Sequence, residues 1–384
     1  MHCNIHREPV ELDERHNFPM LDDDKVYLDS SSTSFTPRVV IDSVNEYFNK
    51  YQANYNRGFN DLVTAISSKI DNVRKKVAEF IGAKQEEIIF TAGASFSSKM
   101  ITNEIAIREL KTDDEVLLCR LDHSSTVTPW LELQELLKNF NVDIKIQDIL
   151  IDLWGDYNEE DLTSKVNDKT KYVVLTHIHN VYGLEMGIKQ LTKDIRAKNP
   201  NVKIVLDASQ SISHIDVNVV DLDVDYLYFS GHKMFAPTGI GVLYARGKSC
   251  KDFEDGTLNI LGIIGLGSAI DYIESIGVDK IENYLFYLTR YLYNELLTID
   301  GIEFNKGIDK CKCEIGYGII SFKHSRVSTE EINELLNYYK IYVRSSSFCQ
   351  KGQDEYIRIS LNPYNTKRDI DKFIKVVKAV VEGQ

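Results

Sequence analysis

Short apolar runs alternate with helical patterns along the first two thirds of this 384-residue chain. Six of the runs are expected to be strands because they are short, apolar and rich in β-branched and aromatic residues. They are residues 86–91, 115–119, 171–176, 203–207, 225–230 and 241–245. This alternation predicts an α/β fold with a mainly parallel sheet covered by helices on both faces. Ligands of such sheets bind beyond the carboxyl ends of the strands.

The helical patterns lie between these strands, as the alternation requires. Residues 62–80 carry apolar side chains at three- and four-residue spacing, and this amphipathic pattern ends at Gly82. Another helix is expected to begin near Trp130, and a third to cover residues 191–197.

The pattern changes at about residue 256. Two long helical patterns lead to two further strand candidates, at residues 262–275, 279–298, 316–322 and 355–361. A closing helix follows, with Thr366 as its expected N-cap and Asp369 three residues later. We therefore expect an N-terminal segment, a large α/β domain and a smaller α+β domain, at residues 1–24, 25–255 and 256–384. The cleft between the two domains is the expected ligand site.

Charge and cysteine content restrict the partners and the compartment. The formal net charge of −13 argues against a nucleic-acid partner, since contact with phosphate backbones needs a basic face. No apolar run is long enough to span a bilayer and the polar start lacks a secretory signal, so no membrane partner is expected. The six cysteines show no disulfide-framework spacing, which indicates a reduced, cytoplasmic protein. Cys311 and Cys313 form a C-x-C pair without a second pair or a histidine cluster, so no metal site is expected.

The segment with the most chemical content is YFSGHKMFAPTGIGVLYA, residues 228–245. An apolar strand stops abruptly at Ser230-Gly231-His232-Lys233, and a Pro-Thr-Gly turn leads into the next strand. A lysine in this position lies near the ligand-binding edge of the sheet, where a lowered pKa makes it a nucleophile toward an aldehyde. Taken alone, a lysine after a strand is more often a solvated surface residue.

A second segment, VLDASQSISH (205–214), supports the catalytic interpretation. In this segment a buried-looking strand ends at Asp207, and Gln210 follows three residues later. A carboxylate in this position can simply cap a helix or face solvent. Placed upstream of Lys233, it can instead form an ion pair with a protonated pyridine nitrogen, which makes a cofactor ring an electron sink.

Several motifs, in this order and spacing, resemble the class V aminotransferase family of fold-type I pyridoxal-phosphate enzymes. They are YLDSSSTSFTP (27–37), FTAGAS (90–95), LDHSSTVTPW (121–130), VLDASQS (205–211), YFSGHKMFAPTGIGVLY (228–244) and IRISLNPYNT (357–366). The resemblance runs from about residue 26 to the C-terminus and is closest to cysteine desulfurases of the sulfur-mobilisation type. It implies a pyridoxal 5′-phosphate cofactor, a large domain with a seven-stranded-type sheet, and a smaller α+β domain.

The resemblance also implies roles for the residues around the cofactor ring. Lys233 would form the Schiff base and later shuttle the substrate Cα proton, and Asp207 would pair with the pyridine nitrogen. His123 would stack on the ring face, while Gln210 and Asn180 would lie near the phenolic oxygen. Individually, His123 can also be a buried core histidine and Asn180 a turn residue; their joint occurrence with Lys233 and Asp207 favours the functional reading.

The phosphate group has its own expected residues. The resemblance implies that the Gly93-Ala94-Ser95 turn, at the start of a helix, binds the phosphate, and free N–H groups at a helix N-terminus suit such a dianion. The resemblance adds Ser230 and His232 to this end of the site. It also matches Thr257 to a position that reaches the phosphate of the partner subunit, so a homodimer is expected; the alternative is that Thr257 caps a helix.

Two arginines and a cysteine near the C-terminus bear on the reaction. Arg344 and Cys349 reproduce the five-residue spacing between a substrate-side arginine and the nucleophilic cysteine of the desulfurases. Arg358 matches the arginine that binds the substrate carboxylate, for which a guanidinium offers two parallel N–H groups. The resemblance thus implies that Lys233 takes the Cα proton of cysteine and that the Cys349 thiolate attacks the substrate sulfur, which yields a persulfide and alanine. A sulfur-acceptor protein is then a candidate partner.

Three departures from the desulfurase pattern leave the reaction open. The segment before Cys349 reads S-S-S-F-C, where the family usually has a glycine and histidines. Asn56 and Asn60 stand where the desulfurases place histidines, which makes Asn56 a candidate substrate-binding residue. Only a few residues separate VLYARGKSC from FEDGT, where the family normally inserts a glycine-rich hairpin over the partner's active site. Its absence predicts a more open pocket, for a larger or more polar substrate.

Two alternatives therefore stay beside the desulfurase. An aminotransferase on the same scaffold needs Lys233, Asp207 and a carboxylate clamp but no thiol, and would act on a small keto compound in a biosynthetic pathway. A catalytically idle binding protein is disfavoured by the intact Lys233 and Asp207. The stretch GIIGLG (262–267) does not match a nicotinamide-binding G-x-G-x-x-G after a strand, and indicates close helix packing instead.

Overall fold

A seven-stranded sheet forms the centre of the molecule in the computed structural model, which describes residues 11–21, 23–56, 58, 60–305, 317–346 and 355–383. Its strands, in spatial order, are β2 (Ile88–Thr91), β8 (Gly241–Ala245), β7 (Tyr226–Ser230), β6 (Lys203–Asp207), β5 (Thr170–Thr176), β3 (Glu115–Leu118) and β4 (Lys145–Asp148). Strand β8 runs antiparallel to both neighbours, and the remaining pairs are parallel. The prediction of a mainly parallel sheet is confirmed, and all six predicted strands belong to it.

One strand of this sheet and the start of one helix beside it were not predicted correctly from the sequence. Strand β4 was missed because it lies at the sheet edge, where its polar run KIQD has one exposed and three half-buried side chains. The helix expected to begin near Trp130 begins six residues earlier, at Ser124, where the His123 side chain accepts the backbone N–H of Ser125 as an N-cap. An imidazole cap gives a weaker sequence signal than the usual Ser, Thr, Asp or Asn.

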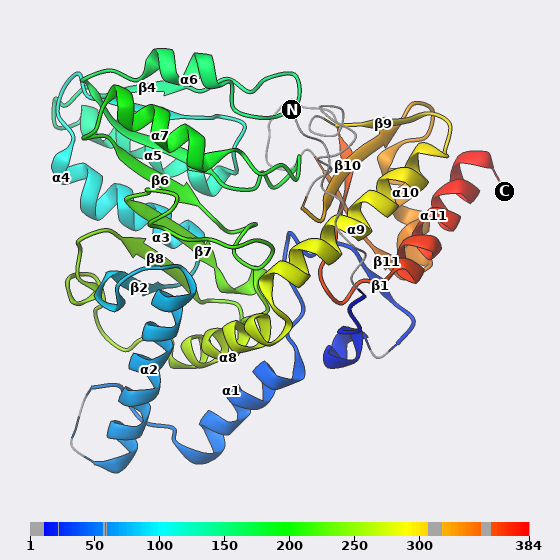
Figure 1. The fold of residues 1–384 in the computed structure, drawn as a ribbon, viewed down its shortest axis with the longest axis horizontal. Coiled ribbons are helices and arrows are strands. Elements are labelled where there is room, and N and C mark those ends of the chain that lie inside the picture. Colours follow the sequence, from blue (N-terminus) through cyan, green and yellow to red (C-terminus); the bar gives the residue numbers. More distant parts are fainter. Residues whose placement is uncertain are drawn as a thin grey trace.

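Helices cover both faces of the sheet (Figure 1). Their bounds are α1 (Arg38–Lys50), α2 (Asp61–Phe80), α3 (Ala94–Met100), α4 (Ile107–Glu109), α5 (Ser124–Lys138), α6 (Glu159–Lys165), α7 (Ile188–Lys198) and α8 (Ile260–Ile276), with a π-helical segment (Ile101–Ala106) joining α3 to α4. Side chains of β7 show how the two layers are filled. Tyr226 and Tyr228 pack in the layer that contains α3 and α5, whereas Leu227 and Phe229 pack in the layer that contains α2, α7 and α8.

The second body is built on a four-stranded antiparallel sheet in the order β12 (Arg344–Ser346), β13 (Tyr356–Ser360), β10 (Ile319–His324) and β9 (Ile302–Phe304). Helices α9 (Val278–Leu297), α10 (Thr329–Tyr338) and α11 (Lys367–Glu382) accompany it. The predicted cap of α11 is confirmed, since Thr366 and Asp369 form a reciprocal capping box. A short parallel pair, β1 (Val26–Tyr27) with β11 (Ile341–Tyr342), ties the chain start to this body.

Helices α8 and α9 pass from one body to the other (Figure 1). Helix α8 packs against α1 and α2, α9 packs against α11 and β10, and the two axes differ by 74° across Gly277. The expected close packing of the glycines in α8 is confirmed: a Cβ atom on Gly267 would stand 2.5 Å from Val73. The division of the chain at residue 256 remains a prediction.

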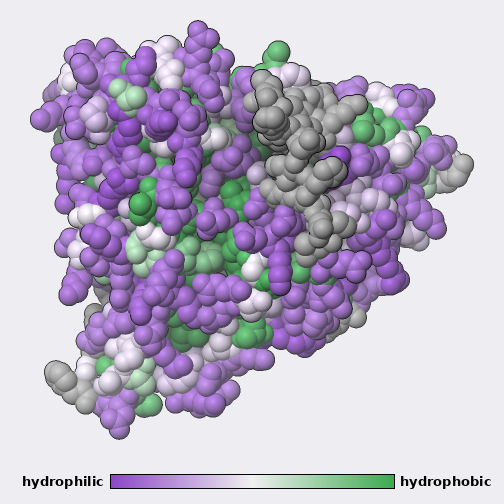
Figure 2. All heavy atoms as spheres, in the orientation of Figure 1, coloured by the Kyte–Doolittle hydropathy of each residue, from purple (hydrophilic) through white to green (hydrophobic). Residues whose placement is uncertain are grey.

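In the view of Figure 2, hydrophilic residues cover most of the face and hydrophobic ones gather toward its middle.

Residues 246–259, between β8 and α8, contain a single 3₁₀ turn, η6 (Cys250–Asp252), and no strand, so a hairpin is absent here. Within the described ranges no single helix has the length and apolar composition to cross a membrane, although the bent pair α8 and α9 passes that test together.

Candidate active site

The carboxyl ends of the parallel strands carry the predicted site residues to one edge of the sheet. Strand β6 ends at Asp207 and β7 ends at Ser230, while His123 and Asn180 follow β3 and β5. A cavity of about 190 Å³ opens there. It is lined by Ser31, Ser32, Ala94, Ser95, His123, Ser125, Asn180, Ser209, Gln210, Ser230, His232, Lys233, Arg344 and Arg358.

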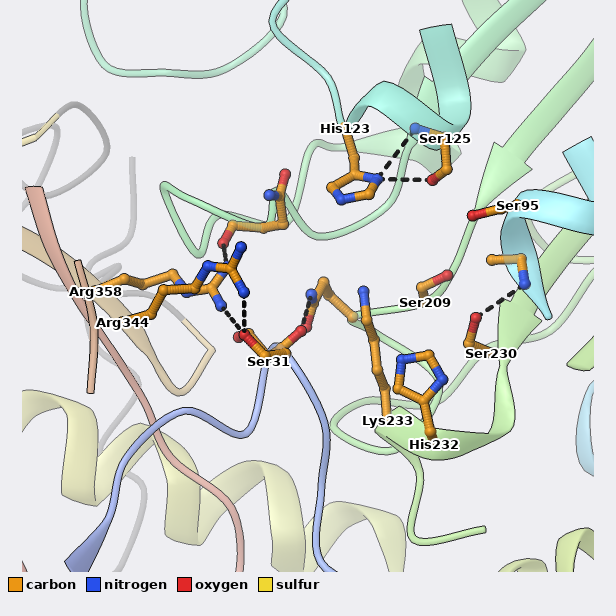
Figure 3. A pocket seen from close by; sticks show the side chains of 14 residues that line it. Ser31, Ser95, His123, Ser125, Ser209, Ser230, His232, Lys233, Arg344 and Arg358 are labelled. Atoms are coloured by element: carbon orange, nitrogen blue, oxygen red, sulfur yellow. Dashed lines mark hydrogen bonds between the residues drawn. The ribbon is translucent and has the colours of Figure 1, made fainter. Parts of the chain in front are cut away.

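Lys233 stands in the middle of this cavity. It ends the 3₁₀ turn η5 (Gly231–Lys233) that follows β7 directly, and its side chain points into the open space in Figure 3. Burial lowers the pKa of Lys233 to about 8, and the charges of Arg358 and Arg344 act in the same direction. The Asp207 carboxylate opposes them. The amine is therefore a far better nucleophile near neutral pH than an exposed lysine.

Asp207 is buried behind the cavity, with 5% of its surface exposed. Its Oδ2 accepts the hydroxyl of Thr126 at 2.8 Å, and its Oδ1 accepts the backbone N–H of Ser209 at 2.9 Å. Hydrogen bonds to both oxygens fix the orientation of this buried carboxylate.

His123 is held as a neutral ring with a defined tautomer. Its Nδ1 accepts the backbone N–H of Ser125 at 3.2 Å and lies 2.7 Å from the Ser125 hydroxyl, so the ring proton belongs on Nε2. Burial lowers the pKa of His123, and the nearby positive charge of Lys233 lowers it further. Figure 3 shows the ring and Lys233 on opposite sides of the same open space.

One end of the cavity is suited to a phosphate. Ser230 Oγ accepts the backbone N–H of Ala94 at 2.9 Å, at the start of α3, and Ser95 and Ser230 lie at this end in Figure 3. Gly93 has φ of +143°, a conformation that favours glycine. A Cβ on Gly241 would lie 2.5 Å from the Gly93 Cα, so the turn and β8 are in close contact. Burial lowers the pKa of His232 to about 4, which makes it a neutral hydrogen-bonding group here.

The opposite end of the cavity carries two guanidinium groups. Arg344 on β12 and Arg358 on β13 are direct partners in the antiparallel ladder, and both bond to Ser32 Oγ, at 3.2 and 2.9 Å. Arg358 also donates to Asp29 Oδ1 and to the Asn180 carbonyl, each at 3.0 Å. Like charges placed directly opposite each other are unfavourable, so an anion between them is stabilised.

Three buried polar atoms around the cavity have no hydrogen-bond partner among the described residues: Ser31 Oγ, Ser209 Oγ and Asn180 Oδ1. Gln210, by contrast, donates to the Ser31 carbonyl at 3.0 Å. Buried polar groups are nearly always paired in native proteins. These orphaned atoms, with cationic groups at one end and backbone N–H groups at the other, fit a polar, anionic ligand such as pyridoxal phosphate with an amino acid.

Two residues named from the sequence, Thr257 and Asn56, lie away from this cavity. Thr257 is exposed in the turn before α8, and Asn259, not Thr257, caps that helix. Asn56 is also exposed and lines a second cavity of about 560 Å³ together with Gly256, the neighbour of Thr257. Cys349 lies outside the described residues, as do Cys311 and Cys313. Within the described ranges no cluster of metal-binding side chains occurs.

The structure also adds residues that sequence reasoning did not single out. Thr126 bonds to Asp207, Ser125 fixes the ring of His123, and Asp29 and Ser32 hold Arg358. All four lie inside the motifs quoted above, YLDSSSTSFTP and LDHSSTVTPW. Ser125 lies two residues from His123, whereas the partners of the other three are distant in sequence, so no local signal reveals those contacts.

The fold and the lysine-centred cavity define the class of fold-type I pyridoxal-phosphate enzymes. The chain belongs to the class V aminotransferase family, whose model ("Aminotransferase class-V") matches residues 26–251 and 247–373. It is 31% identical over 390 residues to a "Probable cysteine desulfurase" of Staphylococcus epidermidis, covering 93% of this chain and 92% of that protein. The apo structure of a cysteine desulfurase from Thermococcus onnurineus NA1 is similar with a TM-score of 0.90 and 29% identity, covering 98% and 99% of the two chains. The fold alone is shared with the Escherichia coli cysteine desulfurase CsdA, at a TM-score of 0.85, 23% identity and coverage of 96% and 97%.

Proposed function

We propose that this chain is a cysteine desulfurase, which converts L-cysteine to L-alanine and carries the released sulfur as a persulfide on Cys349. The observation that supports it best is the polarity of the cavity. A turn suited to a phosphate lies at one end and an arginine pair at the other, with the amine of Lys233 between them. This arrangement accommodates a phosphorylated cofactor and an amino-acid carboxylate at the same time.

The residues of the site fit pyridoxal phosphate group by group. The turn at Gly93 to Ser95, with Ser230 and His232, would hold the phosphate, and Asp207 would pair with the ring nitrogen. His123 would cover the ring face, while Gln210 and Asn180 would lie near the phenolic oxygen. When bound, the cofactor supplies an electron sink beside the substrate Cα.

The protein's own groups would perform the remaining steps. Arg358, fixed by Asp29, would bind the substrate carboxylate, and Arg344 across the ladder would complete the clamp. Lys233 has a pKa of about 8, so it can take the Cα proton and return it near neutral pH. His123 would present its Nε2–H to the ligand.

The sulfur step requires Cys349. The segment that carries it connects β12 to β13, the two paired strands that bear Arg344 and Arg358. Cys349 follows Ser346, the last residue of β12, by three residues in the sequence. As a thiolate it would attack the substrate sulfur: an S–S bond forms, the Cβ–S bond breaks with its electron pair left toward carbon, and protonation gives alanine.

A homodimer with shared sites belongs to this proposal. Asn56 and the segment around Thr257 lie together at an exposed surface and do not reach their own cavity. Large apolar side chains are exposed nearby on α1, α2 and α3; they are Val39, Phe48, Leu62 and Phe96, each about half exposed. Exposed apolar groups of this kind mark association surfaces. A second copy would cover them and bring Thr257 to the phosphate of its partner, and a sulfur-acceptor protein would then take up the persulfide.

The test compares Cys349→Ser with Cys250→Ser, a control at a half-buried thiol that does not line the active-site cavity. Each protein, supplied with pyridoxal phosphate, is incubated with cysteine, and alanine, sulfide and protein persulfide are measured. Wild type and Cys250→Ser should form alanine and a persulfide, whereas Cys349→Ser should form neither and still bind the cofactor. Wild-type protein that makes no alanine from cysteine but passes amino groups to keto acids would be an aminotransferase, and the desulfurase proposal would be wrong.

A further inference from the structure

A chain of three buried side chains leads from the core of the sheet to Asp207. The Tyr228 hydroxyl donates to Thr126 Oγ1 at 3.1 Å, and Thr126 Oγ1 donates to Asp207 Oδ2 at 2.8 Å. Tyr228 and Thr126 have no exposed surface, and Asp207 is 5% exposed. The three residues come from β7, the first turn of α5 and the end of β6, so only the folded sheet brings them together.

The direction of the protons along this chain follows from chemistry. An ionised carboxylate only accepts hydrogen bonds, so Thr126 must donate its single hydroxyl proton to Asp207. The Thr126 oxygen then accepts from Tyr228, whose phenol must be protonated. Burial, and next the negative charge of Asp207, raise the pKa of Tyr228 well above its ordinary value, in agreement with a protonated donor.

We propose that Thr126 and Tyr228 are positioning residues that hold the carboxylate of Asp207 aimed at the ring nitrogen of the cofactor. The inference rests on the proposed function, because it assigns that nitrogen as the partner of Asp207. With Thr126 on Oδ2 and the Ser209 N–H on Oδ1, the plane of the carboxylate is fixed. Hydrogen bonds in a chain polarise one another in a dry interior, so Tyr228 strengthens the donation of Thr126 without touching Asp207.

The alternative is that Tyr228 only fills the core. It belongs to the same apolar layer as Tyr226, two residues earlier on β7 and on the same face of the sheet. Tyr226 makes no hydrogen bond to Thr126 or to Asp207. The two tyrosines are therefore a matched pair, alike in side chain, strand, sheet face and near-complete burial. They differ in that only Tyr228 belongs to the hydrogen-bonded relay that runs from Tyr228 through Thr126 to Asp207.

The experiment measures the dissociation constant of pyridoxal phosphate and the absorption spectrum of the bound cofactor at one pH. The variants are Thr126→Val, Thr126→Ser, Tyr228→Phe and the double variant Thr126→Val with Tyr228→Phe. Loss of one hydrogen bond to a charged group should weaken binding about 10-fold or more in Thr126→Val, and loss of a neutral one about 2- to 10-fold in Tyr228→Phe. Thr126→Ser, which keeps the hydroxyl, should bind as wild type does. Both weakened variants should also lose absorption of the ring-protonated cofactor.

The double variant and the control decide between relay and packing. Tyr228→Phe should add nothing to Thr126→Val, because the relay is already broken, and Tyr226→Phe should leave the dissociation constant unchanged. Thermal unfolding of the cofactor-free variants reports any loss of folding separately. The relay would be overturned, and the proposed function left standing, if Tyr228→Phe had the same effect in the wild-type protein and in the Thr126→Val protein. The same holds if Thr126→Val bound the cofactor with wild-type affinity and spectrum. A wild-type protein that binds no cofactor would contradict the proposed function as well.

Discussion

The pH dependence of cofactor capture by Lys233 offers the most direct test of the site. Only the unprotonated amine attacks an aldehyde, and the pKa of Lys233 is lowered from 10.5 to about 8. At pH 7.5, about one quarter of such amines are unprotonated, against about one in a thousand for an ordinary lysine. Cofactor-free protein should therefore capture pyridoxal phosphate roughly 200-fold faster than its exposed lysines do, on protonation alone.

Two substitutions should move the inflection of this rate in opposite directions. Arg344→Ala removes a positive charge that lowers the pKa of Lys233, so the inflection should rise above pH 8 but stay below 10.5, because burial is the larger cause. Asp207→Asn removes a negative charge that raises this pKa, so the inflection should fall. Arg344 is exposed and bonds only to Ser32 among the described residues, so its loss should leave the fold intact.

The assay is rapid mixing of cofactor-free protein with pyridoxal phosphate between about pH 6 and about pH 10, followed by the absorbance of the Schiff base. Arg326→Ala is the matched control, since this exposed arginine does not line the cavity. An inflection near 10.5 in the wild type, or the same shift in Arg326→Ala and Arg344→Ala, would refute the electrostatic reasoning. Borohydride reduction and mass spectrometry should locate the adduct on Lys233.

Three further predictions concern other parts of the chain. Glu254→Gln should reduce the free energy of unfolding by about 3–5 kcal/mol in urea titrations, because it leaves the buried Arg74 without its counter-ion. In the wild type, Arg74 Nη1 lies 2.7 Å from Glu254 Oε1. A variant with wild-type stability would contradict this prediction. Thr257→Ala should weaken cofactor retention by about 1.5–3 kcal/mol in a dimer, measured by equilibrium titration, and a monomer with full affinity would exclude the shared site. Burial raises the pKa of Asp122 to about 8, and the hydrogen bond from Tyr157 opposes this shift. The contribution of Asp122 to folding stability is therefore fully present below about pH 4 and is lost as the pH rises through 8. Asp122→Asn should thus gain stability relative to wild type between pH 5 and pH 8, and a constant difference would argue against it.

The sequence alone determined the class of fold and the centre of the site. Alternation of apolar strands with helical periodicity predicts a parallel sheet, because parallel strands buried on both faces need uniformly apolar runs and crossover helices. The same rule places the ends of β6 and β7 at one sheet edge, so Asp207 and Lys233 were both expected near the ligand site. These signals are local: each is contained within a stretch of about ten residues.

Only the tertiary structure decided which distant residues support that centre. Thr126 reaches Asp207 and Asp29 reaches Arg358 across 81 and 329 residues of sequence. Arg344 and Arg358 face each other because β12 and β13 pair in one particular register, which the spacing of two arginines does not specify. Asn56 lies apart from the cavity of its own chain, which no motif reveals. Hydrogen bonds and ion pairs depend on distances of a few ångströms between separate elements, and packing of the whole chain sets those distances.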